Sequence, residues 1–176
     1  MKINAKILAN FINKATASCT ITDCLLNFNP EGLCIAVKDM TSTGAIQSKL
    51  IRSNFSDYSE MKATLKDTLR LLNALKNISG LVTLSIESNV FKLTSDELDI
   101  DLIMPAEQYL ECNLSEDGEQ KLFSQLAFDE GFEVEASKLI LAKRNTQTLG
   151  IKSLNAKVQD GIFYIRTGEE SFDKFT

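Results

Sequence analysis

The residues of this chain with the clearest chemical potential are lysines and arginines on stretches that we predict to be helical. The predicted helices, near residues 6–18, 69–78 and from 137 onward, have no acidic residue in their bodies, although the chain holds 24 acidic and 19 basic residues. Amides and hydroxyls fill out the same faces, and such faces suit loose contact with phosphates. The cationic residues are Lys6, Lys14, Arg70, Lys76, Lys138, Lys143, Arg144 and Lys152.

The residues beside these cations narrow the kind of nucleic acid contact. No aromatic residue is interleaved with them, so base stacking on single strands is not indicated. No helix carries a compact set of Arg, Asn and Gln in a recognisable DNA-reading motif, so base readout is not indicated either. We favour sequence-independent contact with duplex phosphates. The competing interpretation is that Lys and Arg are good helix formers on a solvated face.

Catalysis finds little support in the residue types. The chain has no histidine, which removes the commonest general base and every Ser-His or Cys-His arrangement. Asp99 and Asp101 alternate with apolar residues, which is typical of a solvated strand face. The spacing of the four cysteines (Cys19, Cys24, Cys34, Cys112) matches no zinc pattern. We predict a protein that is not an enzyme and that holds neither metal nor cofactor.

The elements that carry these cations recur along the chain. Residues 61–105 predict a strand, a helix capped by Asp67 and ended by Gly80, and then three strands with period-two alternation. Residues 2–51 predict the same order, with a helix over residues 6–18 whose inward residues are Ile7, Leu8, Phe11, Ile12 and Ala15. A third copy begins at 132 with a strand over 132–136, a helix capped by Ser137, and strands over 154–158 and 162–167.

A polar, acidic stretch separates the second copy from the third. It centres on residues 113–119, and the competing interpretation is an ordinary surface loop. We predict three regions: a domain over 1–105, a connector over 106–131 and a partial second domain over 132–176. No apolar run is long enough for a bilayer and the N-terminus is not a signal peptide, so we expect the cytoplasm of a bacterial or phage-infected cell, or a eukaryotic nucleus.

The repeat resembles the DNA sliding clamps, and most closely the trimeric kind, which includes proliferating cell nuclear antigen and the clamps of tailed phages. The likeness rests on two segments, LKDTLRLLNALKNISGLVTLSIESNVFKLTSDELDIDLIMP and EGLCIAVKDMTSTGAIQSKL, and on the position of the acidic stretch. The resemblance implies an α+β DNA-clamp fold of repeated strand–helix–strands units, with antiparallel sheets outside and helices on one face.

The resemblance also implies a function. A clamp subunit is a polymerase processivity factor: a homotrimeric ring encircles double-stranded DNA, is placed there by a clamp loader, and tethers DNA polymerase without reading sequence. Partner peptides of the family bind between the connector and the first domain, where the matching positions here are Val37, Lys38, Asp39, Met40 and Leu114.

This chain departs from the family in length, because trimeric clamp subunits have four such units and about three are present here. We favour a fragment of a longer protein over a shortened relative. Two other functions stay open: a clamp-like protein without a ring that binds peptides or DNA on one face, and a small ligand-binding or enzymatic α+β domain. Oligomeric state separates the first of these from a ring, and a pocket of converging carboxylates would favour the second.

Overall fold

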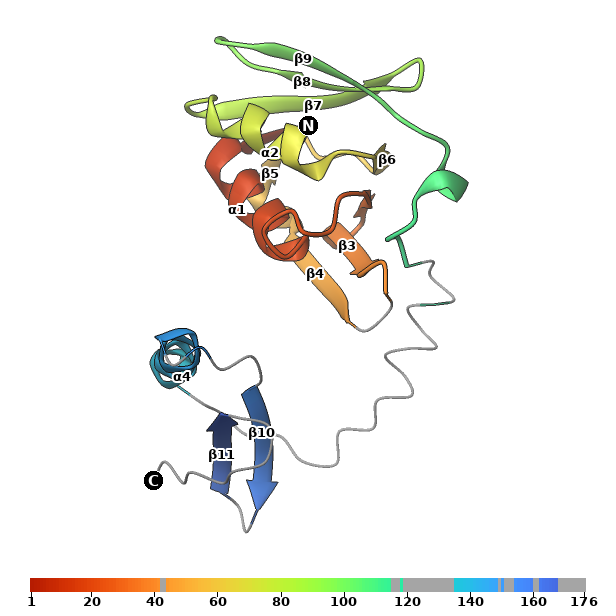
Figure 1. Ribbon diagram of the computed structural model, residues 1–176. Helices are drawn as coiled ribbons and strands as arrows, with labels where there is room; N and C mark the ends of the chain where they lie inside the picture. Colours follow the sequence, from red (N-terminus) through yellow and green to blue (C-terminus); the bar gives the residue numbers. More distant parts are fainter. Residues whose placement is uncertain are drawn as a thin grey trace. The chain divides into compact units, whose positions relative to one another are not determined.

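The computed structural model describes residues 1–41, 44–114, 118, 135–148, 150, 154–159 and 162–167 (Figure 1). The chain divides into two compact units, Met1–Gln125 and Leu126–Thr176. Each unit is described by itself below. Within the described part of the chain, every helix is too short or too polar to cross a membrane.

The first unit contains two copies of the strand–helix–strands repeat. The first copy is β1 (Lys2–Asn4), α1 (Ala5–Ala15), β2 (Cys24–Asn29), β3 (Gly32–Lys38) and β4 (Ala45–Ile51). The second copy is β6 (Met61–Leu65), α2 (Thr68–Lys76), β7 (Leu81–Glu87), β8 (Val90–Thr94) and β9 (Asp99–Ile103). A short helical turn (Arg52–Asn54) and β5 (Phe55–Ser56) lie between the copies, and a second turn (Glu107–Tyr109) follows β9. The predicted α+β class and repeat are confirmed.

The two copies exchange their first strands. The sheets have the orders β5-β1-β7-β8-β9 and β4-β3-β2-β6, and all their pairings are antiparallel. Strand β1 therefore belongs to the sheet of the second copy, where Ile3 lies opposite Val82, and Figure 1 shows the N-terminus beside β7. Strand β6 belongs to the sheet of the first copy, where Ala63 lies opposite Leu26. Neither sheet is complete without the other copy.

Helices α1 and α2 pack side by side (Figure 1) and contribute to one core with both sheets. The largest fully buried side chains come from both copies; they include Phe28, Phe91, Ile12, Leu71 and Leu75. Removing one such side chain from water stabilises the fold by about 1.5–3 kcal/mol. The core of the first unit therefore depends on both helices at once.

Local signals account for most boundaries. Asp67 caps α2, because its Oδ1 accepts the backbone N–H of Arg70 at 2.8 Å, and Gly80 after the helix has a φ of +98°. Helix α1 ends at Ala15, three residues before the predicted end, since residues 17–19 adopt left-handed backbone conformations. The predicted inward position of Ile7 is wrong, because its side chain is 40% exposed.

The second unit contains α4 (Ala136–Thr148), β10 (Leu154–Gln159) and β11 (Ile162–Thr167), and the two strands form an antiparallel hairpin. The predicted helix and both strands are confirmed. Ala136 was predicted to end a strand but begins α4, and residues 131–134 lie outside the described residues. Ser137 therefore lies inside the first turn and does not occupy the predicted cap position.

Candidate functional site

The cations of α1 and α2 form an exposed set on two adjoining helices. Lys6 and Lys14 of α1 and Arg70 and Lys76 of α2 are all exposed. So are Asn10 of α1, Asn73 of α2 and Asn77, which directly follows α2. No residue of either helix forms an ion pair with any part of the chain that the structure describes. We call Lys6, Lys14, Arg70 and Lys76 the helix cations.

Helix electrostatics alone do not explain where these charges lie. Lys14 and Lys76 are in the last turns of their helices, where the macrodipole favours a positive charge. Lys6 and Arg70 are in the first turns, where it disfavours one by about 0.3–1 kcal/mol, and neither first turn contains an acid. A surface selected only for helix stability would place acids there, but the acid at these helix starts is the N-cap Asp67, which precedes the first turn of α2. The pattern therefore favours an anionic partner over the interpretation of a merely solvated face.

The acidic residues lie on strands and turns. Glu31 in the β2–β3 turn pairs with Lys49, and Glu87 of β7 pairs with Lys92 at 2.6 Å. Asp99 and Asp101 are exposed on β9, as the alternation predicts. The first unit thus keeps its charges apart, with cations alone on the helices and mixed charges on the sheets.

The remaining predicted DNA-binding residues belong to the second unit. Lys138, Lys143 and Arg144 are exposed on α4. Lys152 lies outside the described residues. The first unit therefore brings together only the helix cations, and a role of the others beside them stays a prediction.

The predicted partner-peptide positions come from two segments that the structure brings together. The N–H of Lys38 donates to the carbonyl of Cys112 at 2.8 Å, and the N–H of Leu114 donates to the carbonyl of Ala36 at 3.0 Å. Val37 and Asn113 form the antiparallel bridge between these bonds. The first residues of the connector thus extend the edge of β3.

The side chains at this junction are not equivalent. Val37 is fully buried, so it supports the surface and is not available to a partner. The carboxylate of Asp39 accepts the N–H of Gly44 at 2.8 Å and the hydroxyl of Thr41, which holds the turn after β3. Met40 is 73% exposed and is the apolar side chain that a partner can reach.

One residue that holds the connector, Asp23, was not predicted from the sequence. Asp23, only 2% exposed, accepts the backbone N–H groups of Glu111 at 3.0 Å and Cys112 at 2.8 Å. On the other side, the Lys66 ammonium donates to the carbonyl of Tyr109 at 2.9 Å. The sequence does contain one signal for this role, which is an acidic residue directly before the apolar residues of β2. A carboxylate in such a position is buried only if it is hydrogen-bonded.

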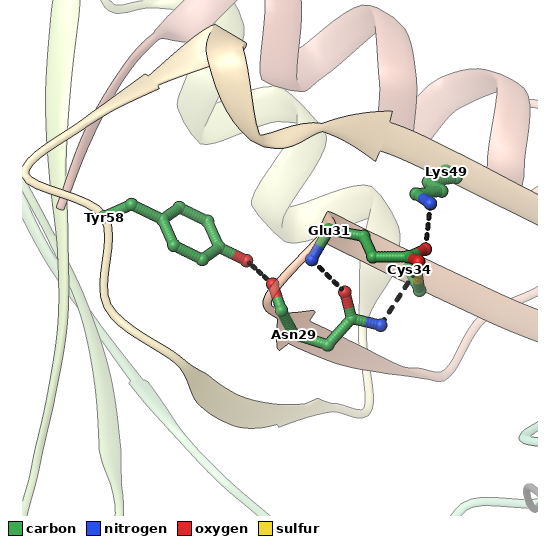
Figure 2. A network of polar contacts seen from close by, with 5 residues as sticks. All are labelled: Asn29, Glu31, Cys34, Lys49 and Tyr58. Atoms are coloured by element: carbon green, nitrogen blue, oxygen red, sulfur yellow. Dashed lines mark hydrogen bonds and ion pairs between the residues drawn. The ribbon is translucent and has the colours of Figure 1, made fainter.

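A separate polar network fixes the β2–β3 hairpin (Figure 2). The Tyr58 hydroxyl donates to the carbonyl of Asn29 at 2.7 Å, and the Asn29 side chain accepts the N–H of Glu31 at 3.0 Å. Burial raises the pKa of Tyr58, and the hydrogen bond from Lys49 lowers the pKa of Glu31. Gly32 is required in this turn, because a Cβ there would lie 2.1 Å from the carbonyl oxygen of Leu50. The network is structural.

No catalytic or metal constellation forms in the described part of the chain. Its histidine, cysteine and acidic residues make no group of three that could hold a metal ion. Burial raises the pKa of Cys24 to about 12 and also raises that of Cys112, so both thiols are poorer nucleophiles at neutral pH than a free cysteine. The four cysteines are free, and two of them are buried.

Known structures show the fold to which this geometry belongs. No protein-family model and no curated protein matches the chain. Among solved structures, the chain is similar to the PCNA2–PCNA3 complex of Sulfolobus tokodaii, with a TM-score of 0.58 at 15% identity, over 93% of this chain and 66% of that one. It is similar to the DNA polymerase III beta chain of Streptococcus pneumoniae TIGR4, with a TM-score of 0.57 at 13% identity, over 99% of this chain and 52% of that one.

A third structure agrees with these two. The beta subunit from DNA polymerase of Streptococcus pyogenes matches with a TM-score of 0.53 at 9% identity, over 99% of this chain and 51% of that one. At such identities the similarity shows the fold alone: the chain has a sliding-clamp fold. It spans between about half and two thirds of the length of these structures.

Proposed function

We propose that this chain is part of a sliding clamp, a non-catalytic processivity factor that surrounds duplex DNA and tethers a DNA polymerase to it. The observation that carries the proposal is the acid-free surface of α1 and α2, whose first turns hold cations against the preference of the helix dipole. The clamp fold supports it, since it supplies the helices that present this surface.

The chemistry of the helix cations fits a mobile contact with DNA. Lysine and arginine on exposed helical faces attract phosphates without reading bases, and each phosphate contact makes the affinity fall with salt by a logarithmic slope of about 0.9. Four helix cations therefore support weak, strongly salt-dependent binding. Such binding lets a ring slide while its topology, and not its affinity, keeps it on the duplex.

Charge reversal tests the DNA surface. The test variant combines Lys6→Glu, Lys14→Glu, Arg70→Glu and Lys76→Glu. We expect its affinity for a fluorescent duplex of mixed sequence to be at least about tenfold lower at low salt, and the salt dependence of that affinity to be mostly lost. Anisotropy titrations at several salt concentrations measure both. In a polymerase assay, we expect this variant to give lower processivity than the wild type. Circular dichroism would show that its fold is intact.

The control carries the same change in charge on the strands: Lys2→Glu, Lys49→Glu, Lys62→Glu and Lys92→Glu. Because Lys49 and Lys92 are ion-paired with Glu31 and Glu87, circular dichroism must show that this variant is folded too. Its duplex affinity should fall by less than about twofold, because surface charges beyond a Debye length are screened. Equal losses in the two variants would mean that net charge alone governs binding, and would rule out the helix surface as the DNA site.

Ring assembly and partner binding are the finer parts of the proposal. Strand β9 is the outer strand of its sheet, and Ile103 on it is 82% exposed, so this edge can pair with a second copy in a homotrimer.

The junction of β3 with the connector, with exposed Met40, is the surface where polymerase and clamp loader peptides would bind. Light scattering on the purified chain separates a trimer from a clamp-like monomer that binds partners on one face, which is the second candidate.

A further inference from the structure

The sheet that contains β3 is split at one end, and the connector fills the split. Strands β2 and β3 pair only between Asn27–Asn29 and Gly32–Cys34. Beyond this point the edge of β3 pairs with residues 112–114 of the connector, through the bridge of Val37 with Asn113. We call residues 109–114 the inserted segment. Cys112 at its centre is 1% exposed, so the segment is packed into the fold and does not merely lie on it.

Asp23 lies at the base of this split, directly before β2. Its two carboxylate oxygens accept different N–H groups of the inserted segment, Oδ2 from Glu111 and Oδ1 from Cys112. Both N–H groups point toward the interior, where an unpaired donor is costly. Hydrogen bonds donated to a carboxylate are also stronger than those donated to a neutral acceptor. One side chain therefore satisfies two consecutive backbone groups of a segment that is 88 residues away in sequence.

The other side-chain contacts near the inserted segment are more exposed than those of Asp23 or lie outside the segment. Lys66 contacts the Tyr109 carbonyl and lies 3.8 Å from the Glu111 carboxylate, but both charged side chains are more than half exposed to solvent. Exposed ion pairs contribute little to stability because water competes for them. The hydroxyl of Thr64 donates to the carbonyl of Pro105, which precedes the segment. The two backbone bonds to β3 set the register of the segment, and the contacts with Asp23 are the buried side-chain contacts that hold Glu111 and Cys112 in place.

We propose that Asp23 is a positioning residue that locks the inserted segment into the edge of β3, and so shapes the surface that partner peptides bind. The role in peptide binding rests on the proposed function above. The lock itself does not, because it concerns only contacts within this chain. If the segment detached, the N–H of Lys38 and the carbonyl of Ala36 would lose their backbone partners, and the edge of β3 that leads to Met40 would be uncovered.

The thiol of Cys112 reports on the lock directly. In the unmutated chain, Cys112 and Cys24 are both buried, so both should react slowly with iodoacetamide. Asp23→Asn keeps the size of the side chain but directs an amide donor at one of the two N–H groups. We expect it to accelerate alkylation of Cys112 at least about tenfold more than that of Cys24, as peptide mass spectrometry would measure. Burial, and then the charge of Asp23, raise the pKa of both thiols, so loss of that charge acts on both and the difference between them reports on the segment. The control Lys66→Gln removes the exposed tie and should change the rate less than about twofold.

Two outcomes would overturn the lock. Alkylation of Cys112 at the wild-type rate in Asp23→Asn would show that the segment stays in place without the carboxylate. Equal acceleration of Cys112 and Cys24 would show that Asp23 holds the fold as a whole and does not position the connector.

The effect on partner binding is measured separately. The probe is a fluorescent peptide selected from a random library on the wild-type chain and lost when Met40 is changed to Glu. We expect Asp23→Asn to weaken this peptide about tenfold and to leave duplex DNA affinity unchanged. Unchanged peptide affinity beside an accelerated Cys112 would overturn the role of the lock in binding. If selection yields no peptide that depends on Met40, the proposed partner surface fails, and the Cys112 rates still decide the lock.

Discussion

The two units of this protein use the same repeat with different results. In the first unit, two copies exchange β1 and β6 and pack α1 against α2, so that Leu71 and Leu75 are fully buried. In the second unit, α4 leaves Leu139, Ile140 and Leu141 exposed, and Thr146 is the only buried side chain among its described residues. The core of the first unit is thus built by strand exchange and helix pairing between copies, whereas the described side chains of α4 add no buried apolar residue.

The strongest test of this difference between the two units is to replace one leucine in each unit with alanine. We expect Leu71→Ala to lower the free energy of unfolding by about 2–5 kcal/mol, because the side chain is fully buried and its loss leaves a cavity. Leu139→Ala, at a site 40% exposed, should change it by less than about 0.5 kcal/mol. Urea denaturation followed by circular dichroism measures both. A large loss in Leu139→Ala would mean that α4 is covered in solution, and the contrast between the units would then disappear.

The N-termini of α2 and α4 provide a second comparison between the units, with a smaller expected effect on stability. Asp67→Ala removes the cap of α2 and should cost about 1 kcal/mol, because the N–H of Arg70 loses its acceptor. Ser137→Ala at the start of α4 should cost nothing, since Ser137 lies within the helix and alanine is the better helix former. Thermal unfolding curves compare the two variants. A loss in Ser137→Ala equal to that in Asp67→Ala would restore the cap that the sequence predicted there.

Local sequence patterns predicted the repeat, and long-range contacts decided the rest. Alternation identified β7 and β8, and an N-cap oxygen with a glycine stop bounded α2, because these signals act within a few residues. The exchange of β1 and β6 was not predicted, since no local pattern states which sheet a strand joins. Strand β5, two residues long, is too short to show any period.

The candidate site divides in the same way. The helix cations could be identified from spacing alone, because their helices are regular and exposed. The partner-peptide positions were predicted through family resemblance and stay a prediction, although the structure pairs residues 36–38 of β3 with residues 112–114. Asp23 could not be found in this way, because its partners lie 88 and 89 residues further along the chain. A buried acid gives a local hint only that some donor must reach it.

The smallest expected effect concerns a tie between helix and sheet in the first unit. Glu97, in the β8–β9 turn, accepts the hydroxyl and the N–H of Ser79, which follows α2. The hydrogen bond from the Ser79 hydroxyl, and then that from its N–H, lower the pKa of Glu97 below its ordinary 4.5. A lowered pKa in the folded state contributes stability above pH 4.5 that is lost as the pH falls through the folded value.

Glu97→Gln should therefore be slightly less stable than the wild type at neutral pH, and the gap should close as the pH falls below 4.5. Ser79→Ala removes one donor and should reduce the same gap, so the double variant should lose less than the sum of the two single losses. Unfolding midpoints measured from neutral to acid pH test both statements. A gap that does not change with pH would show that the carboxylate is not the origin of the tie, and that α2 is held to its sheet by packing alone.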